Sequence, residues 1–376
     1  MVKRNNKPEL LYLHMDITVK CNLYCSYCFY GDYNNIEKIK EEVSIQRLKE
    51  IVNEAILMGC KKIILSGGEV FTSEKFFPML NFLAEKNMKI IFITNGTLVN
   101  KNNIKNILNV YDNIDEIKIS YDGKGNDLIR GEGTSIKILE TINLFENEKL
   151  PWTVNTMISR YNYNSLLDIY EMLKKMNPKY WRIDLPFSLG RYIENKHEIG
   201  IEDLEDVFIN LRNLLKIYLE EKPNFKLWMF SIYQPDLEDS DIIAQELDMH
   251  PCAYNKRNIG VRGNGEVTPC SRFFNFQFGN IKKNSLREIK LKDEFLDFWN
   301  IKISDLKECL NCKYLYVCGG GCRANAVSEN GGIYDKDPTA CAIMPLFEKY
   351  IIPLFSEETQ NCYNKLIERS LIYSNN

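Results

Sequence analysis

Short apolar runs alternate with longer amphipathic stretches over the first half of the chain. The apolar runs are rich in β-branched and aromatic residues, which is typical of strands. They cover Leu11–Thr18, Lys62–Ser66, Lys89–Thr94, Glu116–Ser120, Trp152–Ser159 and Tyr180–Leu185. Helical periodicity lies between them, for example over Ser44–Met58, Glu74–Lys86 and Ser165–Met176. Six strand–helix repeats predict an α/β fold with a parallel sheet, whose chemistry lies at the carboxyl ends of the strands.

The second half of the chain has a different character. Residues 201–222 predict a helix, and an acidic polar segment follows it. Residues 252–341 hold seven of the twelve cysteines, many glycines and little periodicity. We therefore expect a small domain folded around metal rather than around a broad apolar core. A final helix is expected over 343–371. The predicted parts are a barrel over 1–200, a helical linker over 201–250, a cysteine-rich domain over 251–345 and a C-terminal helix over 346–376.

Composition and charge narrow the possible functions. The net charge of −3 gives no electrostatic case for a nucleic-acid partner or an anionic membrane surface. The first residues lack the apolar core of a signal peptide, and the apolar runs are strand-length, so we expect no membrane association and a cytoplasmic location. In such a reducing compartment, clustered cysteines are typically metal ligands or catalytic groups. Only three histidines are present, which favours all-thiolate iron–sulfur sites.

The first cysteine cluster, Cys21, Cys25 and Cys28, directly follows the first predicted strand. Three thiolates on one loop can hold three irons of a cubane cluster and leave the fourth iron open to a small chelator. The amino and carboxylate groups of S-adenosylmethionine (SAM) form such a chelator, and an electron from the cluster can break its sulfonium C–S bond. A zinc loop or a ferredoxin loop is the other interpretation, although no fourth Cys or His lies close in sequence.

This CxxxCxxC spacing, with an aromatic residue before the last cysteine, resembles the radical SAM superfamily. The resemblance implies a partial (β/α)6 barrel with SAM bound by loops at the strand ends. The residues implied to contact SAM are Tyr27, Ser66, Gly67, Gly68, Glu69, Asn95, Ser120 and Arg130. Glu69 would contact the SAM amino group, and Ser120 and Arg130 the SAM carboxylate. Val70 stands where the family usually has proline.

The later cysteines resemble the seven-cysteine pattern of the SPASM domain, which follows many peptide-modifying radical SAM enzymes. The resemblance implies two auxiliary clusters, and therefore three [4Fe–4S] clusters in all. The outer cluster would be held by Cys309, Cys312, Cys318 and Cys341, and the inner cluster by Cys252, Cys270 and Cys322. The rival interpretation is a zinc ribbon built on Cys309, Cys312, Cys318 and Cys322.

The inner cluster is one ligand short in this assignment. Asp248 or His250 completes it, or one iron stays open to a substrate thiolate. The alternative for His250 is a solvated position in a loop. Cys60 is expected to be a small buried filler, and Cys362 has no partner motif.

These features predict a radical SAM oxidoreductase whose auxiliary clusters suit an oxidative outcome. The leading hypothesis is a maturase that forms thioether or carbon–carbon cross-links in a ribosomally made peptide. Enzymes of cofactor or tetrapyrrole biosynthesis and anaerobic sulfatase maturases are alternatives. Ser271 disfavours a sulfatase maturase, because those enzymes place Asp directly after the second SPASM cysteine.

Two further expectations concern electrons and substrate. A non-catalytic electron carrier is disfavoured, because it would need neither the loop Ser66–Glu69 nor an open cluster site. The resemblance implies flavodoxin or ferredoxin as the electron donor. Trp181, Arg182 and Asp184 end the sixth predicted strand and are expected to face the barrel cavity, where Arg182 and Asp184 would bind a peptide backbone or a carboxylate metabolite.

Overall fold

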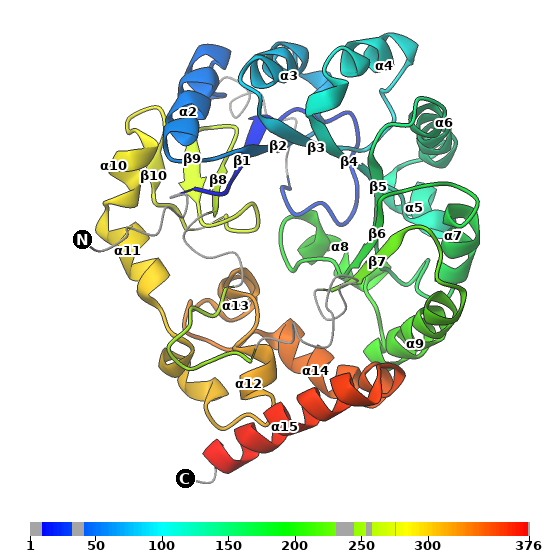
Figure 1. Ribbon diagram of the computed structural model, residues 1–376, viewed down its shortest axis with the longest axis vertical. Helices are drawn as coiled ribbons and strands as arrows, with labels where there is room; N and C mark the ends of the chain where they lie inside the picture. The colour runs from blue at the N-terminus through cyan, green and yellow to red at the C-terminus, as the bar shows by residue number, and fades with distance from the viewer. Residues whose placement is uncertain (1–9, 32–40, 231–243, 253–257, 275, 375–376) are drawn as a thin grey trace.

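One curved sheet organises the molecule (Figure 1). The computed structural model describes residues 10–31, 41–230, 244–252, 258–274 and 276–374. The sheet order is β10-β9-β8-β1-β2-β3-β4-β5-β6-β7, and all neighbours from β8 to β7 pair in parallel. The first six strands are β1 (Tyr12–Thr18), β2 (Lys62–Gly67), β3 (Lys89–Thr94), β4 (Ile114–Ser120), β5 (Trp152–Met157) and β6 (Tyr180–Asp184). All six predicted strands, and the α/β class, are confirmed.

Helices cover the outer, convex face of the sheet (Figure 1). They are α2 (Ile45–Leu57), α3 (Phe76–Glu85), α4 (Lys101–Leu108), α6 (Thr134–Asn147), α7 (Leu166–Leu173) and α9 (Leu204–Glu221). Strand alternation decides which side chains they bury. In β1, Leu13, Met15 and Ile17 are fully buried against helices. The alternate residues His14 and Asp16 therefore lie on the concave face, where a barrel binds its ligands.

Four strands were not predicted, and three of them belong to the cysteine-rich segment. These strands are β7 (Lys226–Met229), β8 (Asn258–Val261), β9 (Glu266–Thr268) and β10 (Gly279–Asn280). β8 pairs in parallel with β1, with Tyr12 opposite Asn258. The cysteine-rich segment therefore extends the barrel sheet.

The cysteine-rich segment also has an apolar core, so the expectation of folding around metal rather than apolar side chains is wrong. Phe278, Phe295 and Phe298 are each at most 2% exposed. The Phe278 ring centre lies 4.8 Å from that of Phe295 and 5.7 Å from that of Phe298, which lies 4.7 Å from that of Trp299 in α11 (Asp293–Asn300). Seven cysteines signalled the metal, but the aromatic residues between them pack as in an ordinary core.

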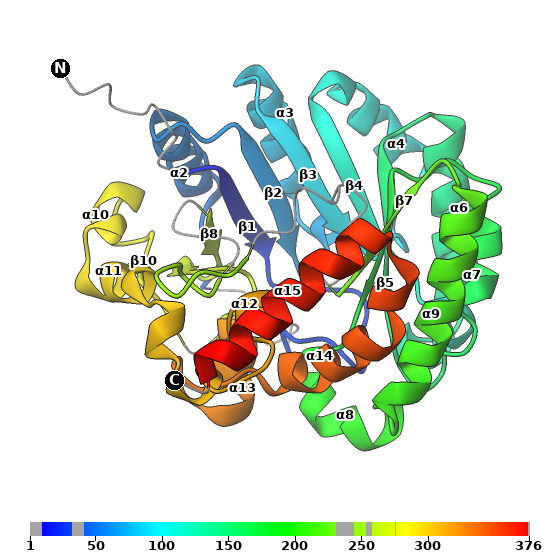
Figure 2. The ribbon, with the colours of Figure 1, turned by 60° about the horizontal axis from the view of Figure 1, so that its bottom comes forward.

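The C-terminal stretch forms two helices rather than the single helix expected. α14 (Pro338–Tyr350) ends before the short turn Ile352–Leu354, and α15 (Glu357–Ser374) follows. Pro353 in that turn cannot donate a helical hydrogen bond, which explains the break. Figure 2 shows α15 crossing the open side of the molecule, and α14 packs against α9. The remaining helices are α5 (Asn126–Arg130), α8 (Arg191–Ile199), α10 (Leu286–Lys290), α12 (Leu315–Cys318) and α13 (Arg323–Asn330).

Two predictions concern segments only partly described. The helix expected over 201–222 is confirmed as α9, whereas residues 231–243 of the acidic segment after it lie outside the described residues. Among the described residues, no helix combines the length and the apolar content needed to cross a bilayer.

Candidate metal and cofactor centre

The first cysteine loop is tied to the carboxyl end of β4. Tyr27 donates a hydrogen bond from its phenol to Oδ2 of Asp122 at 2.8 Å. The same oxygen accepts from Nε of Arg130 at 2.7 Å, and the guanidinium lies 5.1 Å from the centre of the Tyr27 ring. Asp122 and Arg130 are buried. Burial alone would lower the pKa of Arg130, but Asp122, Tyr27 and Cys25 together outweigh it and hold that pKa above its usual value.

The loop after β2 contacts the end of β1 and the start of the cysteine loop through its backbone. Gly68 donates from its N–H to Thr18 O at 3.0 Å, and Glu69 donates to Lys20 O at 2.8 Å. A Cβ on Gly67 would lie 2.2 Å from Thr18 O, and one on Gly68 would lie 2.0 Å from Lys20 O. Both glycines are therefore required for this contact, whatever else the loop binds.

The Glu69 carboxylate is 1% exposed and is used within the protein. It accepts hydrogen bonds from Thr94 Oγ1 at 2.7 Å and from Asn95 N at 2.6 Å. A third donor is Phe71 N at 3.3 Å. Burial raises the Glu69 pKa to about 7, against the effect of these donors. The Glu69 carboxylate therefore links the ends of β2 and β3 through hydrogen bonds. The backbone N–H groups of Gly68 and Glu69 are the groups that contact the segment leading into the cysteine loop.

Three other predicted SAM contacts lie at the ends of β2, β3 and β4. Asn95 follows β3 and donates from Nδ2 to Asn22 Oδ1 at 2.9 Å, inside the cysteine loop. Ser66 belongs to β2 and pairs in register with Asp16 of β1. Ser120 ends β4 and lies opposite Asn155. The structure thus links Tyr27, Asn95, Arg130 and the Gly68–Glu69 backbone to the cysteine loop, and all contacts with SAM stay a prediction.

A segment that sequence reasoning missed holds the other side of the cysteine loop. Arg191, at the start of α8, donates from Nε to Cys25 O at 3.0 Å and also binds Gly31 O. Its guanidinium lies 3.7 Å from the Tyr24 ring centre. Gly190 has a φ of +55°, and a Cβ there would lie 2.5 Å from Cys28 O. No local pattern marks these residues, because every contact spans most of the barrel.

Several candidate ligands already receive the hydrogen bonds that a cluster thiolate needs. Cys21 Sγ accepts from Leu23 N at 3.4 Å, and Cys312 Sγ accepts from Tyr314 N at 3.4 Å. Cys270 receives the same kind of bond from the residue two positions later. Such N–H···S bonds stabilise negative charge on sulfur. Without metal, burial raises the pKa of the Cys21 thiol to about 12, so binding a cluster must displace its proton.

The cysteines assigned to the outer cluster line one cavity of about 180 Å³. Its walls include Cys309, Cys312, Cys318 and Cys341, together with Asp337 and Met344. Thiols from four separate positions converge there, so the residues fit a cluster. Among the described residues, no three His, Cys, Asp or Glu side chains converge closely enough for a single metal ion.

Asp337 connects the cysteines assigned to the inner cluster (the inner set) with those assigned to the outer cluster (the outer set). Cys270 and Cys322 interact electrostatically with each other. Asp337, 3% exposed, accepts from Cys322 N at 2.7 Å and also lines the outer cavity. The grouping of Cys252 with this pair rests on the resemblance alone.

His250 is half-buried, and both of its ring nitrogens contact backbone groups. Its Nδ1 accepts from Cys252 N at 2.9 Å, and its Nε2 lies 3.0 Å from Phe298 O, to which it donates. The ring packs 4.7 Å from that of Trp299. Burial lowers the His250 pKa, which keeps the ring neutral. The solvated-loop alternative is therefore wrong, and both nitrogens are engaged. Asp248 is exposed.

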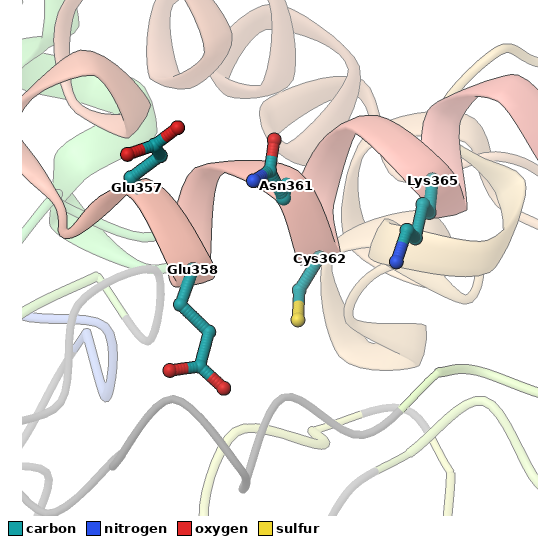
Figure 3. A pocket seen from close by; sticks show the side chains of 5 residues that line it. All are labelled: Glu357, Glu358, Asn361, Cys362 and Lys365. Atoms are coloured by element: carbon teal, nitrogen blue, oxygen red, sulfur yellow. The ribbon is translucent and has the colours of Figure 1, made fainter.

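Other predicted side chains fall outside this centre. Cys60 is 2% exposed in the main core, as expected for a filler. Figure 3 shows Cys362 on α15 beside a hollow that is also lined by Glu357, Glu358, Asn361 and Lys365. None of the predicted cluster ligands lines this hollow.

The predicted cavity residues of β6 lie on two different faces. Trp181 is fully buried and donates from Nε1 to Thr156 Oγ1 at 2.9 Å, on the helix side, so its expected cavity position is wrong. Arg182 and Asp184 lie on the opposite, concave face because strand side chains alternate. They bind each other, with Nε to Oδ2 at 2.6 Å.

Two family models match this chain. The radical SAM superfamily model matches residues 15–173, and the model of an iron–sulfur cluster-binding domain, SPASM, matches residues 252–313. The chain therefore carries a radical SAM domain and a SPASM domain. Radical SAM and SPASM domains imply [4Fe–4S] clusters and SAM. The SPASM match contains Cys252, Cys270, Cys309 and Cys312, so the roles of Cys318, Cys322 and Cys341 stay predictions.

Relatives of this radical SAM chain differ in what they act on. The AdoMet-dependent heme synthase of Methanosarcina barkeri is 24% identical, over 90% of this chain and 97% of its own length. The PqqA peptide cyclase of Granulibacter bethesdensis is 23% identical, over 88% of this chain and 86% of its own. The crystal structure of Streptococcus suis SuiB bound to precursor peptide SuiA has a TM-score of 0.69 at 16% identity, covering 88% of this chain and 76% of SuiB, which shows a shared fold.

Proposed function

We propose that this radical SAM enzyme uses three [4Fe–4S] clusters and SAM to modify a ribosomally made peptide oxidatively, by a thioether or carbon–carbon cross-link. The observation that carries the proposal is the joining of two cluster-binding regions in one sheet, with β8 paired to β1. A substrate on the concave face would therefore lie between the SAM loop and the inner auxiliary set. The PqqA peptide cyclase and SuiB, which binds a precursor peptide, support a peptide as substrate.

When bound, SAM and its cluster supply one-electron cleavage chemistry that permits abstraction of a substrate hydrogen atom. Cys21, Cys25 and Cys28 would hold that cluster. The protein's own contribution is position: Tyr27, Asp122 and the Arg191 contacts fix the cysteine loop from two sides. Fixed geometry matters because hydrogen abstraction requires the reacting atoms to be held near contact.

An oxidative outcome needs a path for a second electron. The inner set would accept it, and Asp337 links the inner ligand Cys322 to the cavity of the outer set. The electron donor for SAM cleavage would be flavodoxin or ferredoxin, as the family resemblance implies.

A second candidate is a small-molecule reaction of cofactor or tetrapyrrole biosynthesis. The heme synthase relative, which aligns over nearly its whole length, favours this candidate. A sulfatase maturase is less favoured, because Ser271 follows Cys270.

Co-expression of the chain with a peptide encoded beside its gene tests the proposal. The intact mass of the peptide should fall by two hydrogens per cross-link, and Cys25→Ala should abolish the loss. Cys362→Ala, on a helix outside the ligand sets, is the matched control. An unchanged mass, with no deuterium gained in deuterated water and with continued SAM cleavage, would instead favour a small-molecule substrate.

The number of clusters is tested by iron analysis of the purified holoenzyme. Each cubane holds four irons, so Cys309→Ala should lower the iron content by about a third. No change relative to wild type would contradict the outer-cluster assignment.

A further inference from the structure

Arg272 lies between the two cluster-binding regions. It follows Cys270 by two positions, and its backbone N–H is directed at the sulfur of that cysteine. Its guanidinium lies 3.9 Å from the centre of the Phe187 ring, and its charge also acts on Cys270. The side chain is half-buried, and within the described part of the chain it makes no ion pair or side-chain hydrogen bond. A guanidinium stacked on a ring keeps its N–H donors available to a ligand.

Half-buried aromatic rings surround the same junction. Phe29 follows Cys28, Phe187 follows β6, and Phe274 lies beside Arg272. The Phe29 ring centre lies 6.1 Å from that of Phe187 and 5.7 Å from that of Phe274, both in edge-to-face arrangements. The three rings therefore bring the SAM loop, the β6–α8 loop and the inner auxiliary segment together.

A second arginine holds this junction in place. Arg262 donates from Nη2 to Ser271 O at 2.7 Å and to Phe273 O at 2.6 Å, the carbonyls on either side of Arg272. It is 7% exposed, and its guanidinium lies 3.7 Å from the Phe274 ring centre. Arg262 thus uses Nη2 on the backbone, and its Nη1 lies 3.6 Å from Asp16 Oδ2. Arg272 has no such partner among the described residues, so its guanidinium remains for a ligand.

We infer that Arg272, with Phe29, Phe187 and Phe274, forms a substrate subsite for a carboxylate attached to an apolar or aromatic group. The inference rests on the proposed function only in placing substrate between the SAM loop and the inner set. A guanidinium binds a carboxylate through two parallel hydrogen bonds. The rings exclude water from that pair, which strengthens it, and they pack against the apolar part of the ligand. The carboxylate belongs to an acidic side chain or chain end of a peptide, or to a small-molecule acid.

Isothermal titration of the SAM-loaded holoenzyme with two matched probes tests the subsite. The probes are 3-phenylpropionate and its neutral isostere 3-phenylpropionamide. Wild type should bind the carboxylate about tenfold more tightly than the amide, since a charged hydrogen-bonded pair contributes more than a neutral one. Arg272→Gln should remove the preference, and Arg272→Lys should keep part of it. Arg212→Gln, at an exposed position of α9, is the matched control.

The same titration with N-acetyl-Phe-Glu-amide and N-acetyl-Phe-Gln-amide separates the two sources. A preference for the Glu peptide indicates a peptide acid, and a preference confined to 3-phenylpropionate indicates a small-molecule acid. Equal binding of both small probes by wild type would overturn the subsite. The subsite would also be overturned if Arg272→Gln altered the EPR signal of the auxiliary cluster but left the affinities for both probes unchanged. In that case Arg272 would act on the cluster rather than on a ligand. These affinities need no turnover, so the subsite stands or falls independently of the peptide-mass experiment.

Discussion

Tyr27 donates a hydrogen bond to Asp122 across 2.8 Å, and this bond connects the cysteine loop after β1 to the end of β4. Asp122 also accepts from Arg130 Nε and from Met157 N at 2.8 Å. A single buried carboxylate thus sets the positions of three segments. The SAM loop is held by residues outside it, which makes those residues testable apart from the cysteines.

Asp122→Asn should lower the free energy of unfolding of the cluster-free chain by about 3–5 kcal/mol, because it leaves the buried Arg130 charge without its partner. Tyr27→Phe removes one hydrogen bond and should cost about 1 kcal/mol. Urea denaturation followed by circular dichroism measures both. Glu202→Gln is the control, since Glu202 pairs with Arg160 but is 84% exposed. An Asp122→Asn loss no larger than that of Tyr27→Phe would contradict this account.

Gly68→Ala should displace the loop after β2 and weaken SAM binding by the holoenzyme. The added Cβ would lie 2.0 Å from Lys20 O, and forced overpacking of this kind costs about 1–3 kcal/mol. SAM affinity from equilibrium dialysis should therefore fall by about tenfold or more. Gly331→Ala strains the backbone at the end of α13, where φ is +91°, but its Cβ would meet nothing within 4 Å, so SAM affinity should stay unchanged.

Protonation of the buried His14 side chain should lower the stability of the folded chain in mild acid. Burial lowers the His14 pKa below 6.5, and Arg262 and Lys118 act in the same direction, whereas Asp16 raises it. The unfolded chain therefore binds a proton below pH 6.5 that the folded chain resists, so stability is lost as pH falls from 6.5 through the folded-state pKa. His14→Asn should flatten the dependence of melting temperature on pH between 7 and 5, as read by intrinsic fluorescence. His197→Asn, at an exposed position of α8, should not.

His250 should prove to be a positioning residue rather than an iron ligand. Because both ring nitrogens bind backbone groups, pulsed EPR of the reduced holoenzyme should show no strong histidine nitrogen coupling at an auxiliary cluster. His250→Gln can retain one of the two bonds, so it should keep more auxiliary-cluster iron than His250→Ala. A strong coupling that disappears in both variants would show direct ligation instead.

Elements that short stretches of sequence encode were predicted, whereas elements that depend on contacts between distant residues were missed. The six barrel strands are regular apolar runs, and their ends were predicted to within two residues. β8 was missed because Asn258–Val261 is short and contains a glycine, which disfavours a strand. Pairing with β1 overrides that local preference.

The site shows the same division. The cysteines and the glycine loop could be read from spacing, because a loop supplies those groups consecutively. Arg191 could not, since its contact with Cys25 joins positions more than 160 residues apart. Glu69 was expected to face SAM, and only the three-dimensional structure reveals the three internal donors that engage its carboxylate.

The pairing of β8 with β1 also has a consequence for synthesis on the ribosome. Tyr12 leaves the exit tunnel early, whereas its partner Asn258 is translated only after the whole barrel. Until then, one edge of β1 presents unpaired N–H and C=O groups, which other nascent chains can capture. A chaperone that shields this edge should therefore raise the soluble yield more than any change within the barrel helices. Pairing of β8 with β1 is the step that closes this edge of β1.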